Sequence, residues 1–313
     1  MSPVLSQGSP AVHLPQLYPL LYEPLVRRAL EEDLGRAGDL TSDAILPAHQ
    51  TAEAQVVARA AGRVAGLPVS LSAFRLLDPA IEIESFISDG EDVEAGTVLA
   101  TVRGPARSIL SAERTALNLL GRLCGIATAT RDMQRLVEPH GAHIVCTRKT
   151  TPGLRTLEKY AVRCGGGQNH RFGLDDAVLI KDNHIALAGG IRPAVESARQ
   201  HVGHLVKIEV EVDSLDQLRE ALDLGADVVL LDNMSLETLR EAVALAKGGG
   251  HRDLRRDQPE DGRGDRGHGG GSAVDGVADP QRAGFGCGAG CGVGNHLRHG
   301  AHDGVNRSSL TKV

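Results

Sequence analysis

The pattern of hydrophobic and polar residues divides the chain into regions. The first region covers the residues before about 115. The stretch "YEPLVRRALEEDLG" has the apolar spacing of a helix that ends at Gly35. Two later stretches alternate like strands, with turns expected at Asp89-Gly90 and Ala95-Gly96. They read "AEAQVVARAAGRVAGLP" and "AIEIESFISDGEDVEAGTVLATVRG". This first region is therefore predicted to mix helices and strands.

A second region, with a different pattern, covers about residues 116 to 247. This region opens with a predicted helix around "SAERTALNLLGRLCGIATAT". Short apolar stretches then alternate four times with helices that begin near Leu154, Pro193, Leu215 and Leu236. The four stretches are "HIVCT", "DAVLI", "LVKIEVE" and "DVVLL". Alternation of strands and helices predicts a parallel sheet.

Charged residues stand at the C-terminal end of each of these four stretches. The endings read "TRKT", "IKDNH", "EVEVDS" and "LLDN". A single charged strand end is usually a solvated turn, but four in succession favour a functional face. In a (β/α) barrel the catalytic groups come from this end of the strands.

The segment after about residue 248 shows neither the helical nor the strand periodicity. It holds 18 of the 38 glycines, with many Arg, Asp and His, and is predicted to be disordered. The predicted organisation is an N-terminal extension over 1–24, an α/β domain over 25–115, a barrel-like catalytic domain over 116–247, and an aberrant tail over 248–313.

Composition narrows the classes of function. The net charge of -6 and the 2% aromatic content argue against nucleic acid as the main partner, because stacking platforms are missing. We expect no membrane span, because no run of eighteen or more apolar residues occurs. Five scattered cysteines suit a reducing cytoplasm, and no secretory signal is recognised.

Against this acidic background, positive charge gathers between Thr147 and Gly173. The segment holds six lysines and arginines and a single acid, Glu158. Guanidinium groups bind carboxylates and phosphates in a bidentate manner, and the triple glycine at 165–167 allows a close approach of the backbone or a positive φ. Arg155 and Lys159 are interpreted as solvated cations on the exposed face of a helix. The candidates for binding a small anion are Arg148, Lys149, Arg163, His170, Arg171 and Lys181.

Two acids, Glu211 and Asp232, end the next two strands. Carboxylates among cations are costly unless they bind a metal, hydroxyl groups or a developing positive charge. These features together predict a site for a polyanion that becomes cationic at one carbon. Phosphoribosyl transfer fits, because pyrophosphate leaves and the ribose gains oxocarbenium character.

Several motifs between about residues 25 and 247 resemble the quinolinate phosphoribosyltransferase family. They are "EDLGRAGDLTSDAIL", "SAERTALNLLGRLCGIATAT", "TRKTTPGLRTLEKYAVRCGGGQNHRFGLDDAVLIKDNH", "EVEVDS" and "VLLDNM". The resemblance implies an α/β fold, with an N-terminal α/β sandwich followed by an incomplete (β/α) barrel that is truncated in this chain. It implies that quinolinate and phosphoribosyl pyrophosphate (PRPP) give nicotinate mononucleotide, pyrophosphate and CO2, with Mg²⁺ accompanying PRPP.

The resemblance also implies roles for individual residues. Arg148, His170 and Arg171 match positions that hold the two quinolinate carboxylates, and Arg114 matches a residue that the partner subunit of a dimer donates. Four residues are expected to carry the chemistry. Lys149 and Lys181 match lysines that face the phosphates and the substrate carboxylate, and Glu211 and Asp232 match acids near the ribose and the metal. A homodimer or higher homo-oligomer is therefore expected.

The chain departs from the family after "REAVALAKGGG". Two further βα units are expected there, with a Ser-Gly-Gly loop for the 5-phosphate and a "LTHSAP" strand end, and neither is present. Plausible GC-rich codons for the tail, read one nucleotide later, give both motifs in order. We interpret the tail as a frameshift near Lys247 to Gly250. Without the last two strands, the edge of the strand Val228 to Leu231 is expected to be exposed, and the chain is expected to be poorly stable and nearly inactive.

Other interpretations stay open at this stage. Cys287, Cys291, His296, His299 and His302 could form a metal site, but their spacing is a weak signal for zinc. The enzyme could act on another aromatic acid, or the chain could be a non-catalytic remnant that binds a dicarboxylate. The stretch "DGEDVEAGTVLATVRG" suggests a lipoyl-like carrier, yet no lysine stands at a hairpin tip.

Overall fold

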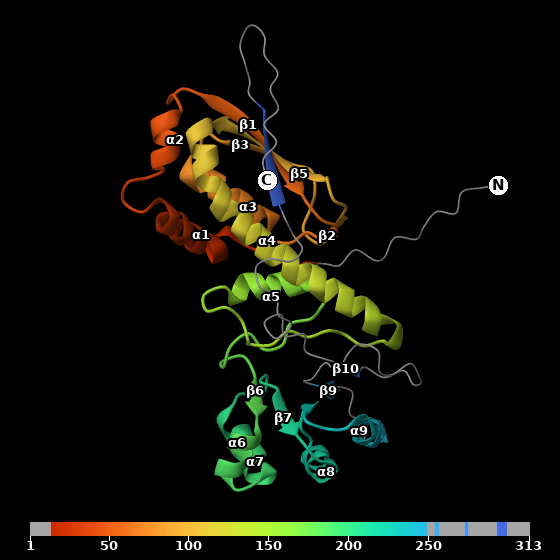
Figure 1. Ribbon diagram of the computed structural model, residues 1–313. Helices are drawn as coiled ribbons and strands as arrows, with labels where there is room; N and C mark the ends of the chain where they lie inside the picture. The colour runs from red at the N-terminus through yellow and green to blue at the C-terminus, as the bar shows by residue number, and fades with distance from the viewer. Residues whose placement is uncertain (1–13, 249–253, 257–272, 275–292, 299–313) are drawn as a thin grey trace, which may run out of the picture. The chain divides into compact units, whose positions relative to one another are not determined.

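The computed structural model describes residues 14–248, 254–256, 273–274 and 293–298, and it divides into two compact units (Figure 1). The first unit falls within residues 1–128, 156–166 and 286–313. The second falls within residues 129–155 and 167–285. The helix α4 (Ala106–Val137) is continuous across the first of these boundaries.

The first unit is built on a four-stranded antiparallel sheet in the order β11-β1-β5-β3. Its strands are β1 (Thr51–Ala58), β3 (Glu82–Ser85), β5 (Val98–Pro105) and β11 (Val293–Arg298). The short strands β2 (Gly62–Arg63) and β4 (Asp92–Val93) form a second sheet. The predicted mixture of helices and strands is confirmed here.

Helices accompany this sheet, and their ends follow the sequence signals. They are α1 (Pro19–Leu34), α2 (Leu40–Ile45), α3 (Leu67–Leu77) and α5 (Arg155–Cys164), together with the first part of α4. Gly35 ends α1 as expected, with its amide donating to Glu31 O. Gly90 and Gly96 both take φ of 89°, which confirms the two predicted turns.

The second unit holds a parallel sheet in the order β10-β9-β8-β7-β6. The strands are β6 (Val178–Ile180), β7 (Ile208–Val212), β8 (Val228–Leu231), β9 (Leu254–Arg256) and β10 (Ala273–Val274). The helices are α6 (Asp182–Ala188), α7 (Ile191–His201), α8 (Leu215–Asp223) and α9 (Leu236–Gly248), after a 3-10 turn, η1 (Glu138–His140). The predicted α/β fold, an N-terminal sheet domain followed by strand-helix units, is confirmed (Figure 1).

One face of this parallel sheet packs against α7, α8 and α9. Its hydrophobic core includes Ile180 of β6, Val210 and Val212 of β7, and Val229 and Leu231 of β8. Successive side chains of a strand point to opposite faces of a sheet. Residues at the alternate positions of these strands therefore point away from the helices.

Two expectations about the strands are wrong. "HIVCT" forms no strand, only an isolated bridge between Val145 and Gln168. The Gln134 side chain donates a hydrogen bond to Ala142 O and accepts one from Ile144 N. These backbone groups are therefore not available for pairing with a neighbouring strand. The edge of β8 is also not exposed, because β9 pairs with it in parallel.

Three short strands, β9, β10 and β11, lie in the tail that was predicted to lack regular structure. The other residues of the tail after Gly248 lie outside the described residues, and so do four of the five candidates for the metal site in the tail, all except His296. No helix in the described part of the chain is long and apolar enough to span a membrane.

The interpretation of Lys159 as a solvated cation is wrong. Its side chain is among the largest fully buried ones, with 2% exposure. The neighbouring Glu158 is also buried and accepts a hydrogen bond of 2.8 Å from Arg122 Nε of α4. The pair of Arg122 and Glu158 ties α5 to α4, and α5 does not present Lys159 to solvent.

Candidate functional site

Charged side chains gather at the carboxyl edge of the parallel sheet. Lys181 directly follows β6, Glu211 lies near the end of β7, and Asp232 directly follows β8. The three strands are parallel, with Ile180 opposite Val210 and Glu211 opposite Leu230. The strand ends therefore meet at one edge, as the sequence predicted.

The acids of β7 point away from the helices. Val210 and Val212 belong to the core that the helices cover, so Glu209 and Glu211 lie on the opposite face. Glu209 is only 5% exposed. Sequence reasoning missed this residue, although the alternation "IEVEV" is a signal that two carboxylates share one face.

Two ion pairs join the acids of β7 to candidate cations. Nζ of Lys181 lies 2.8 Å from Oε2 of Glu211, which makes an ion pair. Nε2 of His170 lies 2.6 Å from Oε2 of Glu209. The structure thus brings together candidates from two loops and a strand that are far apart in the sequence.

Arg148 and Arg171 form the strongly cationic part of the site. Burial lowers the pKa of Arg171, and the nearby Arg148 lowers it further, while Glu209 and Asp176 act in the opposite direction. Arg171 Nη1 donates to Ala177 O at 3.0 Å. Among the described residues, the Nε atoms of Arg148 and Arg171 are both buried without a hydrogen-bond partner. Two buried guanidinium donors of this kind favour an anionic ligand.

The other candidates lie around this cluster with weaker connections. Lys149 is exposed, and its amide donates to Thr147 Oγ1 at 3.0 Å. Asp232 accepts a hydrogen bond from Asn233 Nδ2 at 3.0 Å. Arg114 is exposed on α4 within the first unit. Gly166 takes φ of 88° at the end of α5, as expected of the triple glycine.

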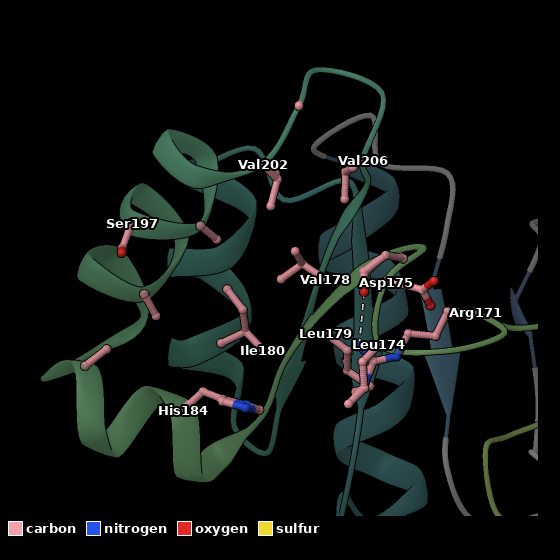
Figure 2. A pocket seen from close by; sticks show the side chains of 15 residues that line it. Arg171, Leu174, Asp175, Val178, Leu179, Ile180, His184, Ser197, Val202 and Val206 are labelled. Carbon is pink, nitrogen blue, oxygen red and sulfur yellow. Dashed lines mark hydrogen bonds between the residues drawn. The ribbon is translucent and has the colours of Figure 1, made fainter.

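A cavity of about 550 Å³ also lies in the second unit, between β6 and the helices α6 and α7. Figure 2 shows Ile180, Ser197 and Val202 among the side chains around it. Arg171 is the only candidate residue in its described lining, which is mostly apolar. The charged candidates gather at the strand ends and, Arg171 apart, not around this cavity, so we assign the candidate site to the strand ends.

Comparison with known proteins decides the family. Residues 39–124 match the N-terminal domain of quinolinate phosphoribosyl transferase, and residues 126–253 match its C-terminal domain. A probable nicotinate-nucleotide pyrophosphorylase (carboxylating) of Bacillus subtilis is 48% identical over 226 residues, which cover 72% of this chain and 78% of that protein. The chain belongs to the quinolinate phosphoribosyltransferase family.

Other members support this assignment. A mitochondrial quinolinate phosphoribosyltransferase (decarboxylating) of Nicotiana tabacum is 38% identical over 242 residues, covering 72% of this chain and 68% of that protein. The crystal structure of NadC from Streptococcus pyogenes has 34% identity and a TM-score of 0.82, covering 92% of this chain and all of that chain. The match to the C-terminal domain of the family ends at residue 253, close to the predicted departure near 248.

The donor set of this face suits a metal ion that arrives with the substrate. The described residues contain no group of three His, Cys, Asp or Glu side chains that could hold a metal by themselves. Mg²⁺ is commonly held by one or two carboxylates together with substrate phosphates. Glu211 and Asp232 at the strand ends fit such an arrangement.

Proposed function

We propose that this chain transfers the ribosyl phosphate group of PRPP to the nitrogen of quinolinate, with loss of CO2, as a quinolinate phosphoribosyltransferase of NAD biosynthesis. The proposal is supported by the names of the family relatives. The observation that carries it is the cluster of Arg148, His170 and Arg171, because two buried guanidinium donors and an imidazole suit a pair of carboxylates.

Most of the catalysis in this proposal is positioning and charge stabilisation. The pyridine nitrogen attacks C1 of the ribose, and pyrophosphate leaves with the electrons of its C–O bond. The ring becomes a pyridinium, which accepts the electron pair released as the 2-carboxylate departs as CO2. The carbon then takes a proton, which gives nicotinate mononucleotide.

The acids and lysines take separate parts in this scheme. Glu211 and Asp232 stabilise the positive charge that develops on the ribose, and Lys149 and Lys181 face the phosphates and the substrate carboxylate. Mg²⁺, carried by PRPP, would neutralise charge on the departing pyrophosphate, with Glu211 and Asp232 as the carboxylates that hold it. Arg114, exposed on α4, would act in the site of a second copy, so we propose a homodimer or larger assembly.

The proposed compartment is the cytoplasm. The three described cysteines, Cys124, Cys146 and Cys164, are buried thiols outside any disulfide, which agrees with a reducing environment. No nucleic acid or membrane takes part in the proposed activity.

A ligand comparison tests the proposal against the two alternatives. Titration calorimetry with the full chain is expected to show that quinolinate binds at least about tenfold more tightly than nicotinate, since a second carboxylate gains charge-assisted hydrogen bonds. Stronger binding of another aromatic acid would favour the related pyrophosphorylase.

The same experiment separates an enzyme from a binding remnant. A remnant has one observation in its favour, namely that the match to the C-terminal domain ends at residue 253. Product analysis with PRPP should therefore use both the chain as written and a frame-restored chain, whose gene has one base added or removed at codons 247–250. Quinolinate binding without nicotinate mononucleotide from either chain would favour the remnant.

A further inference from the structure

Glu209 is a buried acid in the middle of the candidate site, and its partner is one of the predicted substrate-binding residues. Its side chain is 7% exposed, and that of His170 is 13% exposed. Oε2 of Glu209 lies 2.6 Å from Nε2 of His170. The contact joins β7 to the loop that follows the triple glycine, so it fixes that loop to the sheet.

The chemistry of this contact determines how His170 meets a ligand. An ionised carboxylate only accepts hydrogen bonds, so Nε2 of His170 carries a hydrogen that it donates to Glu209. The hydrogen bond at one ring nitrogen sets the role of the other. A substrate carboxylate that contacts the ring must therefore use Nδ1. Because a carboxylate accepts hydrogen bonds, Nδ1 must also carry a hydrogen in that contact. Glu209 then serves as the counter-ion of the doubly protonated ring.

Glu209 also affects the arginines beside it. The nearness of Arg148 lowers the pKa of Arg171, after the larger effect of burial, and Glu209 raises it. Two guanidinium groups held close together repel each other, and a buried carboxylate near them offsets this repulsion. The same acid therefore orients the imidazole and helps to keep the arginines together.

We infer that Glu209 is a positioning residue for substrate binding, which orients His170 through Nε2 and holds the cationic cluster in the geometry that a dicarboxylate requires. This inference rests on the proposed function. It concerns a residue that would not touch the substrate itself, since it acts through His170 and Arg171.

The sign of a mutational effect distinguishes this role from simple electrostatics. If Glu209 were only a negative charge near an anion site, its removal would relieve repulsion and tighten the binding of quinolinate. If it positions the cations, Glu209→Ala should instead raise the Kd for quinolinate by about tenfold or more. Glu209→Gln keeps an oxygen that can accept from Nε2 but loses the charge, so it should raise the Kd less, by a few-fold.

The measurement is titration calorimetry of the full chain with quinolinate, after thermal unfolding has shown that each variant is folded. Glu196→Ala is the matched control, because it removes the same charge from an exposed position on α7. It should leave the Kd within about twofold. Unchanged or tighter binding in both Glu209 variants would overturn the inference and leave the proposed function standing. Failure of the unaltered chain to bind quinolinate would overturn the proposed function instead.

A second readout does not depend on any ligand. Nitrogen-15 NMR of the histidine rings, with His170 identified by its loss in His170→Gln, should show a hydrogen-bonded Nε2–H in the unaltered chain. This signal should persist in Glu209→Gln and disappear in Glu209→Ala. A His170 ring with the same state in all three chains would contradict the positioning role.

Discussion

Nζ of Lys181 lies 2.8 Å from Oε2 of Glu211, so a cation that follows β6 is paired with an acid of the neighbouring strand β7. The side chain of Lys181 is 43% exposed and that of Glu211 only 11%. Solvent screens such a pair, and its contribution to folding is at most about 1 kcal/mol. The pair is better understood as preorganised charge at the edge where the reaction is proposed.

The Lys181–Glu211 pair leads to a prediction about catalysis. In the frame-restored chain, Glu211→Gln should lower kcat by about 10²-fold, because a fixed charge that stabilises the transition state is lost. The KM for quinolinate and the unfolding temperature should change little. Steady-state kinetics with thermal unfolding checks both. An equal loss in Glu196→Ala, on exposed α7, would show that the effect is not specific to the site.

A prediction about the tail concerns the whole protein. The chain as written should be less stable than the frame-restored chain, and its kcat/KM should be lower by about 10²-fold or more, because the predicted 5-phosphate loop is missing. Sequencing the genomic DNA across codons 240 to 295 should show a missing or extra base near codon 248. Equal activity of the two chains would contradict the frameshift interpretation.

Asp39 gives a prediction with a defined pH dependence. Its carboxylate caps α2, accepting from Thr41 N at 3.1 Å and Ser42 N at 3.0 Å. The hydrogen bonds from Ser42 are the largest cause that lowers the pKa of Asp39 below its ordinary value of 3.8. Asp39→Ala should cost about 1 kcal/mol of unfolding free energy at neutral pH.

The sign of that pH dependence follows from linkage. A group whose pKa is lowered by folding contributes stability above its unfolded pKa and loses it as the pH falls through the folded value. The cost of Asp39→Ala should therefore be constant above about pH 5 and shrink below about pH 4. Denaturant unfolding at several pH values measures it, and a cost that grows toward low pH would contradict the assignment.

Gly66 gives a prediction about packing. It takes φ of 75°, and a Cβ at this position would lie 2.2 Å from Leu123 Cδ1. Gly66→Ala should therefore cost about 1 to 2 kcal/mol of backbone strain and a further 1 to 3 kcal/mol of overpacking. Gly141 is the matched control, because it has the same αL conformation, with φ of 69° and ψ of 19°, and nothing within 4 Å of a Cβ. Its alanine variant should lose only the strain term, as denaturant unfolding will show.

Much of the parallel sheet could be predicted because each strand is a short apolar stretch between helical periods. "DAVLI", "LVKIEVE" and "DVVLL" become β6, β7 and β8, and their charged ends meet as expected. "HIVCT" is also a short, largely apolar stretch, yet it forms only a bridge, because the side chain of Gln134 binds the backbone beside it. Composition does not reveal such a competing hydrogen bond.

The errors at single residues have a common physical cause. From the sequence, Lys159 is interpreted as a solvated cation and Glu209 as an ordinary polar position in a strand, because charged residues are rarely buried. Their burial depends on packing with segments far away in the sequence: the helix α5 that carries Lys159 is tied to α4 by Glu158 and Arg122, and Glu209 pairs with His170. The local sequence pattern predicts which face of a helix or strand carries a residue. The partner that offsets the cost of burying its charge is seen only in the folded structure.

The measurement that tests the central claim most directly is the release of labelled CO2 from quinolinate that carries carbon-14 in its 2-carboxylate. The frame-restored chain, with PRPP and Mg²⁺, should release one CO2 for each pyrophosphate and each nicotinate mononucleotide formed. Arg171→Ala in the same chain should release at least about tenfold less at low quinolinate concentration. Pyrophosphate formed without labelled CO2, or no PRPP-dependent release at all, would contradict the claim.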